Sequence, residues 1–98
     1  MSAKAKSKEI LDKDVWAVDG KIGKVKEIEI DLDDWRVTNL EVELEKDVAE
    51  SVLGAKKSGV RNMLEISALE KGTIRRTDKG LLLQIRKDQL HVYLKPVV

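Results

Sequence analysis

The sequence of 98 residues lacks cysteine and contains one histidine, one proline and only 3% aromatic residues. The absence of cysteine excludes disulfide bonds and thiolate metal sites. Because His91 is the only histidine, a multi-histidine metal site is excluded and a catalytic triad would need other residue types. We therefore expect His91 to lie on the surface of a helix or strand, without a catalytic role.

Long apolar runs are also missing. No run approaches the roughly 20 residues that a membrane-spanning helix needs. The opening segment, MSAKAKSKEILDKD, lacks the apolar core of a signal peptide. We therefore expect a cytoplasmic protein that does not insert directly into a membrane. The length favours a single domain, which we place at residues 9–95, between a basic flexible tail (1–8) and a C-terminal tail (96–98).

Charge, in contrast, is abundant and unevenly placed. Charged residues make up 38% of the chain, and the net charge is only +1. Residues 27–50 hold ten acids against Arg36 and Lys46, a net charge of −8, so the remaining residues carry +9. Such separation favours a charged partner or self-association. The richness in charged residues is also typical of thermophilic proteins with surface ion-pair networks.

Alternating apolar residues predict a mainly β fold. Val15 and Val18 precede the turn dipeptide Asp19-Gly20, which indicates a hairpin. The next two strands are long and alternate apolar with polar residues. Their apolar positions are Ile22, Val25, Ile28, Ile30 and Leu32 in the first, and Val37, Leu40, Val42 and Leu44 in the second.

Each long strand contains one three-residue step in its two-residue rhythm, at Val25–Ile28 and at Val37–Leu40. An odd step moves every later side chain to the other face of a sheet, unless a β-bulge absorbs it. We therefore predict a bulge at each step, and bulges bend sheets toward closure. The inward-facing residues of both strands are mainly even-numbered, and directly opposed residues share a face of the sheet. The loop between the strands should therefore have an odd number of residues, such as Asp33-Asp34-Trp35.

In the second half of the chain the spacing of the apolar residues changes. Residues 47–53 have a helical pattern, with Asp47 as the N-cap and Gly54 just beyond the C-terminus. A fourth strand is predicted at 64–68 and a fifth in the run LLLQI, whereas the segment GTIRRTDKG remains ambiguous. Residues 86–95 fit either a short terminal helix capped by Asp88 or another strand, and we favour the helix. Pro96 predicts an extended chain around Lys95.

Eight carboxylates lie between residues 27 and 45, where they could form a metal site, a catalytic pair or the solvated face of a sheet. The segment DLDDW resembles the start of a calcium loop, but Arg36 and Val42 occupy the positions that require Gly and Glu. Catalytic carboxylates need burial or a close charged neighbour, which the wet face of a hairpin does not offer. We therefore expect no metal, no cofactor and no enzymatic activity, and interpret the acids as a solvated sheet face.

The predicted register nevertheless places Glu27 opposite Glu41, and directly opposed like charges destabilise a sheet. We hypothesise that a basic surface, from another protein or another copy, covers this face. Trp35 lies in the acidic turn, where its ring either folds back over the barrel end or anchors an interface. The tail YLKPVV could dock on a neighbour. The residues predicted to bind a partner are Trp35, Glu27, Glu29, Glu41, Glu43, Tyr93, Leu94 and Val97.

Nucleic acid is a less suitable partner. The segment DGKIGK lacks the spacing of a phosphate-binding loop, and its glycines better suit a hairpin turn and a bulge at Gly23. The segments GAKKSGVR and IRRTDKG could contact RNA phosphates, but none of the three aromatic residues lies among them for base stacking. Trp16, between Val15 and Val18, is expected to pack in the core or at a sheet edge.

The stretch VWAVDGKIGKVKEIEIDLDDWRVTNLEVEL resembles the PRC-barrel family, with the resemblance most specific over residues 12–45. The later segments MLEISAL and GLLLQI resemble further strands of that family, whereas the region around RRTDKG departs from it. The resemblance implies a small, strongly bent β-barrel of about five or six strands with one or two short helices.

The same resemblance implies an adaptor rather than an enzyme. Chains of this size resemble the archaeal PRC-barrel proteins of cell division, which act with the FtsZ ring and its anchor SepF. The implied partners are a related PRC-barrel protein, SepF or both, in a homo- or heterodimer at the division site. An RNA- or ribosome-associated assembly factor is the alternative, because the family also occurs in a ribosome-maturation factor.

Overall fold

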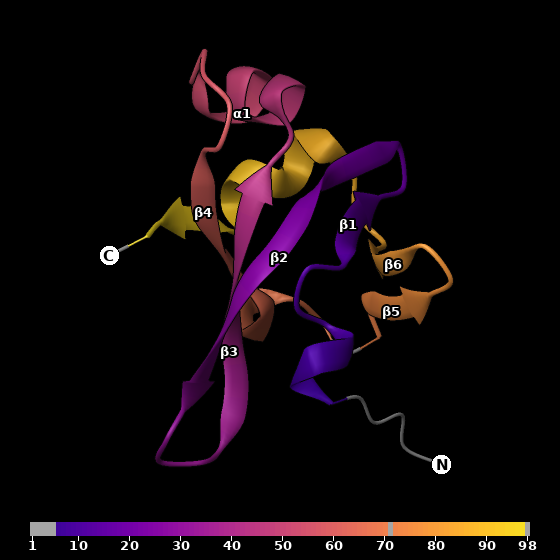
Figure 1. Cartoon of the computed structure of the whole chain (residues 1–98), viewed down its shortest axis with the longest axis vertical. Helices are drawn as coiled ribbons and strands as arrows, with labels where there is room; N and C mark the ends of the chain where they lie inside the picture. The colour runs from indigo at the N-terminus through magenta and orange to yellow at the C-terminus, as the bar shows by residue number, and fades with distance from the viewer. Residues whose placement is uncertain (1–5, 71, 98) are drawn as a thin grey trace.

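A computed structural model describes residues 6–70 and 72–97 of the chain (Figure 1). The fold is mainly β, as predicted, and is built on a single sheet of seven strands in the order β5-β6-β1-β2-β3-β4-β7. The strands are β1 (Asp14–Ala17), β2 (Gly20–Asp31), β3 (Arg36–Leu44), β4 (Arg61–Glu65), β5 (Ile74–Thr77), β6 (Gly80–Leu83) and β7 (Leu94–Pro96). β1 and β6 pair in parallel, and the other strand pairs of the described residues are antiparallel. β5 and β7 are the two edges of the sheet.

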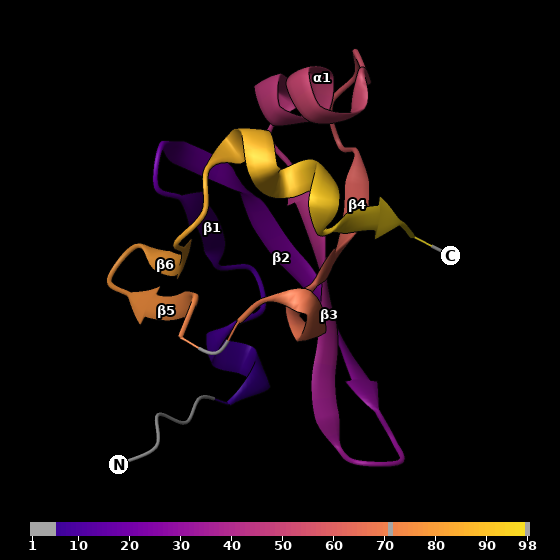
Figure 2. The same ribbon diagram turned by 180° about the vertical axis from the view of Figure 1, so that it is seen from behind.

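In the part of the chain that the structure describes, one α-helix and three short 3-10 helices accompany the sheet. They are η1 (Ser7–Glu9), α1 (Lys46–Leu53), η2 (Ile66–Ala68) and η3 (Lys87–Val92). α1 lies at the end of the sheet where β3 stops, and η3 runs across the back of the sheet (Figure 2). No helix in residues 6–70 and 72–97 is long and apolar enough to cross a membrane.

Both predicted bulges are present in the β2–β3 pair. Lys26 is skipped between the pairs Val25–Val42 and Glu27–Glu41, and Thr38 is skipped between Glu29–Asn39 and Ile30–Val37. The loop between the strands has four residues instead of the predicted three, because Asp31 pairs with Arg36. The Thr38 bulge offsets that extra residue. Glu27 therefore lies opposite Glu41, as predicted.

The core lies between the curled sheet, α1 and η3. Val15, Val25, Val42, Leu83 and Leu90 are fully shielded from solvent. Val48 and Ala49 place the apolar face of α1 on the same cluster. The inner halves of the two long strands place their alternating apolar residues in this cluster and their polar residues in water. In the outer halves the apolar residues Ile30, Leu32 and Val37 remain exposed, so the apolar alternation continues beyond the core.

Several boundaries differ from the predictions. The first turn lies at Val18-Asp19, one residue earlier than predicted, since Gly20 already pairs with Ala17. The β1–β2 register shift skips Ile22, the neighbour of Gly23. Gly54 does end α1 in a left-handed conformation, with φ of 70°, but the N-cap is Glu45, not Asp47.

Toward the C-terminus, the predicted strand 64–68 stops at Glu65, and the chain turns into η2. The ambiguous segment GTIRRTDKG forms most of the β5–β6 hairpin. Residues 86–95 supply both alternatives, the helix η3 and then β7, with Arg86 instead of Asp88 as the N-cap. Of the predicted tail 1–8, residues 1–5 lie outside the described part, and η1 begins at Ser7.

Candidate functional site

The outer half of the β2–β3 hairpin extends beyond the body of the molecule along its longest dimension (Figure 1). We call residues 26–38 the distal ribbon. The last backbone bond to β2 from outside the hairpin joins Asp12 N to Val25 O, at 2.7 Å, and the last pair of β3 with β4 is Asn39–Glu65. Within the described residues, the ribbon beyond these points has two free edges. Isolated two-stranded ribbons are marginal in water, and free edges are templates for pairing with another chain.

Four large apolar side chains of the distal ribbon are exposed. Relative exposures are 47% for Ile30, 70% for Leu32, 76% for Trp35 and 43% for Val37. Trp35 has a φ of 57°, which is uncommon for a bulky residue. The ring does not fold back onto the body, so the first of the two predicted roles for Trp35 is wrong. Large exposed apolar patches are typical of interaction sites.

The distal ribbon also carries uncompensated acids. Within the described residues, Glu27, Glu29, Asp31 and Asp33 form no ion pair. Asp31 Oδ1 instead accepts a hydrogen bond from the backbone N–H of Asp33, at 2.8 Å, which orders the turn. The ribbon thus combines negative charge with exposed apolar surface.

The like-charge pair Glu27–Glu41 is partly relieved within the chain. Arg61 on β4 donates to Glu41 Oε2 at 3.0 Å and lies 4.0 Å from Glu43. Glu29 accepts a hydrogen bond from the amide of Asn39 at 2.6 Å. Glu27 alone of these four acids has neither kind of partner in the described residues.

A shallow groove of about 430 Å³ brings together predicted residues from both halves of the sequence. Glu27, Glu29 and Glu41 line it on the side of β2 and β3, and Val97 lines it beyond β7. Tyr93 is half-buried against the core, and Leu94 belongs to the core itself, with 8% exposure. The burial of Leu94 argues against direct contact with a partner.

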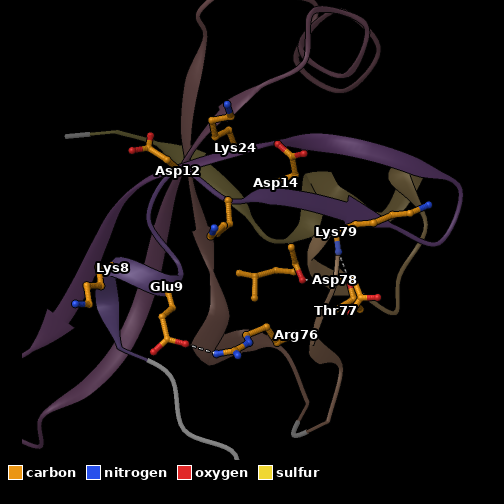
Figure 3. A pocket seen from close by; sticks show the side chains of 12 residues that line it. Lys8, Glu9, Asp12, Asp14, Lys24, Arg76, Thr77, Asp78 and Lys79 are labelled. Atoms are coloured by element: carbon orange, nitrogen blue, oxygen red, sulfur yellow. Dashed lines mark hydrogen bonds and ion pairs between the residues drawn. The ribbon is translucent and has the colours of Figure 1, made fainter.

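A second, larger groove of about 660 Å³ was not anticipated from the sequence (Figure 3). It lies between η1 with the segment that follows it, the start of β1 with the part of β2 beside it, and the β5–β6 hairpin. Its lining residues are Lys8, Glu9, Asp12, Lys13, Asp14, Lys24, Arg76, Thr77, Asp78, Lys79, Gly80 and Leu81. Because three distant segments form it, no local sequence pattern announces it.

Internal ion pairs leave this groove with a surplus of positive charge. Glu9 pairs with Arg76 at 2.7 Å, and Asp12 and Asp14 pair with lysines outside the lining, Lys26 at 3.2 Å and Lys21 at 3.3 Å. Four lining lysines are exposed and have no ion pair in the described residues. They are Lys8, Lys13, Lys24 and Lys79, and one lining acid, Asp78, is likewise exposed and without an ion pair there. We call this feature the basic groove.

A backbone hydrogen bond from Lys6, together with the pair across the basic groove, lowers the pKa of Glu9. Its carboxylate accepts hydrogen bonds from the backbone N–H of Lys6 and from the Arg76 guanidinium, and these lower the pKa below its ordinary value of 4.5. Glu9 therefore stays ionised and holds η1 to β5, with Lys8 at one end of the groove and Lys79 at the other (Figure 3).

The basic groove continues into an apolar hollow of about 460 Å³, with which it shares Thr77, Asp78 and Lys79. Trp16, Ala17 and Leu82 complete the lining of this hollow. Trp16 is half-buried, and its indole N–H donates to the carbonyl of Lys79 at 3.1 Å. The Lys79 ammonium lies 5.7 Å from the centre of the same ring, within the range of a cation–π contact.

His91 is exposed, as predicted, with Nδ1 2.9 Å from the carbonyl oxygen of Asp88. Among residues 6–70 and 72–97, no group of three or more His, Asp or Glu side chains is arranged to hold a metal ion.

No protein-family model matches the sequence, and a comparison with curated proteins gives no significant match. The structure itself defines the class as a mainly β domain, in which one bent seven-stranded sheet carries a protruding hairpin.

Proposed function

We propose that this protein is a non-enzymatic adaptor of the PRC-barrel type that acts in archaeal FtsZ-based cell division. In this proposal it is cytoplasmic, gathers at the division site, and binds a related PRC-barrel protein, SepF or both, as a homo- or heterodimer. The resemblance over residues 12–45 supports the family, and the mainly β fold is compatible with it.

The observation that carries the proposal is the distal ribbon. Its two free edges have unpaired backbone groups, and the apolar side chains of Leu32 and Trp35 are exposed to water. Both features favour contact with another chain. Tryptophan is prominent among the residues that dominate binding energy at protein interfaces. A protein partner is favoured over RNA at this surface, because the acids of the ribbon repel phosphate groups.

Trp35→Ala is expected to weaken capture of the partner by about 30-fold, which corresponds to about 2 kcal/mol at an interface anchor. Its side chain is 76% exposed, so the free energy of unfolding should change by less than about 0.5 kcal/mol. The measurement is a calorimetric titration of purified SepF, and separately of a related PRC-barrel protein, with each variant.

Val92→Ala is the matched control, because Val92 is also apolar and 60% exposed but lies on η3, away from the distal ribbon. It should bind like the wild type. Equal affinity of the wild type and Trp35→Ala for both partners, or no binding by the wild type, would contradict the proposal.

A further inference from the structure

Two surfaces of this molecule are complementary to each other in charge. Within the described residues, the distal ribbon presents four acids without an ion pair, and the basic groove presents four lysines without one against a single such acid, Asp78. The same separation is visible in the sequence, where residues 27–50 carry −8 and the rest of the chain +9. The acids of the ribbon and the lysines of the groove could therefore pair with each other between two molecules.

The apolar parts of the two surfaces are complementary as well. The apolar hollow beside the basic groove, lined by Trp16, Ala17 and Leu82, adjoins it through the β5–β6 turn. The ribbon likewise has Leu32 and Trp35 at its tip, next to its acids. A ribbon lying along the groove can thus place acids against lysines and its apolar tip in the hollow.

We infer that the distal ribbon of one copy docks into the basic groove of a second copy, so that copies join head to tail. This inference rests on the proposed function, because both assign binding to the distal ribbon. It specifies a second copy of this chain as the partner that the ribbon binds. The contact must be between molecules, because the ribbon continues β2 and points away from the β5–β6 hairpin (Figure 1).

A symmetric dimer through the two ribbons is disfavoured. It would bring Glu27, Glu29 and Asp31 of one copy against the acids of the other, and opposed like charges destabilise paired strands. A head-to-tail contact leaves one free ribbon and one free groove at the ends of every open assembly. Such heterologous contacts propagate into rings or open chains.

The test uses two variants, each blocked on one side. Glu27→Lys with Glu29→Lys reverses the charge of the ribbon, and Lys13→Glu with Lys24→Glu reverses that of the groove. All four side chains are exposed, so both variants should fold, which thermal unfolding by circular dichroism verifies. Lys56→Glu with Lys57→Glu, in the exposed loop after α1, is the matched control.

Sedimentation velocity over increasing concentration at low salt gives the readout. The wild type and the control should grow steadily in mass, and salt should reverse the growth because the contact is ionic. Each blocked variant should remain a monomer. An equimolar mixture of the two should recover assembly at least to the dimer, because one variant keeps an intact groove and the other an intact ribbon. The two reversed surfaces are also opposite in charge again, so growth beyond the dimer is compatible with the inference.

The inference is overturned if the wild type stays monomeric, if either blocked variant assembles like the wild type, or if the mixture fails to form a dimer. The partner titrations with Trp35→Ala separate this outcome from the proposed function. If a partner is bound in a way that depends on Trp35 but the protein does not self-assemble, the adaptor proposal stands and only the head-to-tail contact is removed. Self-assembly without any capture removes the adaptor proposal instead.

Discussion

Gly23→Ala should lower the free energy of unfolding by about 3 kcal/mol, the upper range for inserting a methyl group into a packed interior. Gly23 lies on β2 between Val15 of β1 and Leu44 of β3. A Cβ at this position would overlap with the carbonyl oxygen of Glu43 on the adjacent strand. Backbone atoms at the centre of three paired strands cannot move aside cheaply, so the strands must separate.

Gly59→Ala is the control for this prediction. Gly59 has a φ of 76° and open space around the position of a Cβ, so alanine there costs only about 1 kcal/mol of backbone strain. Urea denaturation of both variants gives the comparison. A loss at Gly23 no greater than that at Gly59 would show that β2 and β3 do not approach as closely as described.

Leu90→Ala should cost about 3 kcal/mol, within the range for truncating a buried leucine. Leu90 is fully shielded and is the buried residue of η3, through which this helix joins the common core. Its removal leaves a cavity between η3 and the sheet, and the helix is too short to hold its place without that contact. The free energy of unfolding is again measured by urea denaturation.

Val92→Ala, two residues further along η3 and 60% exposed, should change stability by less than about 0.5 kcal/mol. Comparing Leu90→Ala with Val92→Ala separates the loss of buried contacts from the effect of alanine on the helix, because both substitutions introduce alanine into η3. Similar losses for the two variants would mean that η3 is not docked through Leu90.

The parts of the fold that follow from local pattern were predictable from the sequence. The odd steps at Val25–Ile28 and Val37–Leu40 required bulges, and the structure has them at Lys26 and Thr38. The predicted loop was one residue too short, yet Glu27 still faces Glu41. The bulge at Thr38 shifts the register by one residue and so compensates for the longer loop. Parity fixes the register of such a hairpin but not the residue at which it turns.

Features that depend on contacts between distant segments were not predictable. The basic groove needs η1, β1, β2 and the β5–β6 hairpin together, and the segment GTIRRTDKG had no clear period of its own. The alternation of MLEISAL continued past Glu65, but the chain turns there into η2. Trp35 was expected either to fold back over the body or to anchor an interface, and its 76% exposure contradicts the first alternative, whereas the second stays a prediction.

The central claim is that the distal ribbon is uncovered in the single molecule and becomes covered by docking. Amide hydrogen–deuterium exchange of residues 26–38, measured at low and at high protein concentration, tests it most directly. The account predicts rapid exchange at the free edges of the ribbon in dilute protein and protection as the concentration rises or SepF is added. Equal exchange under all these conditions, whether fast or slow, would contradict it.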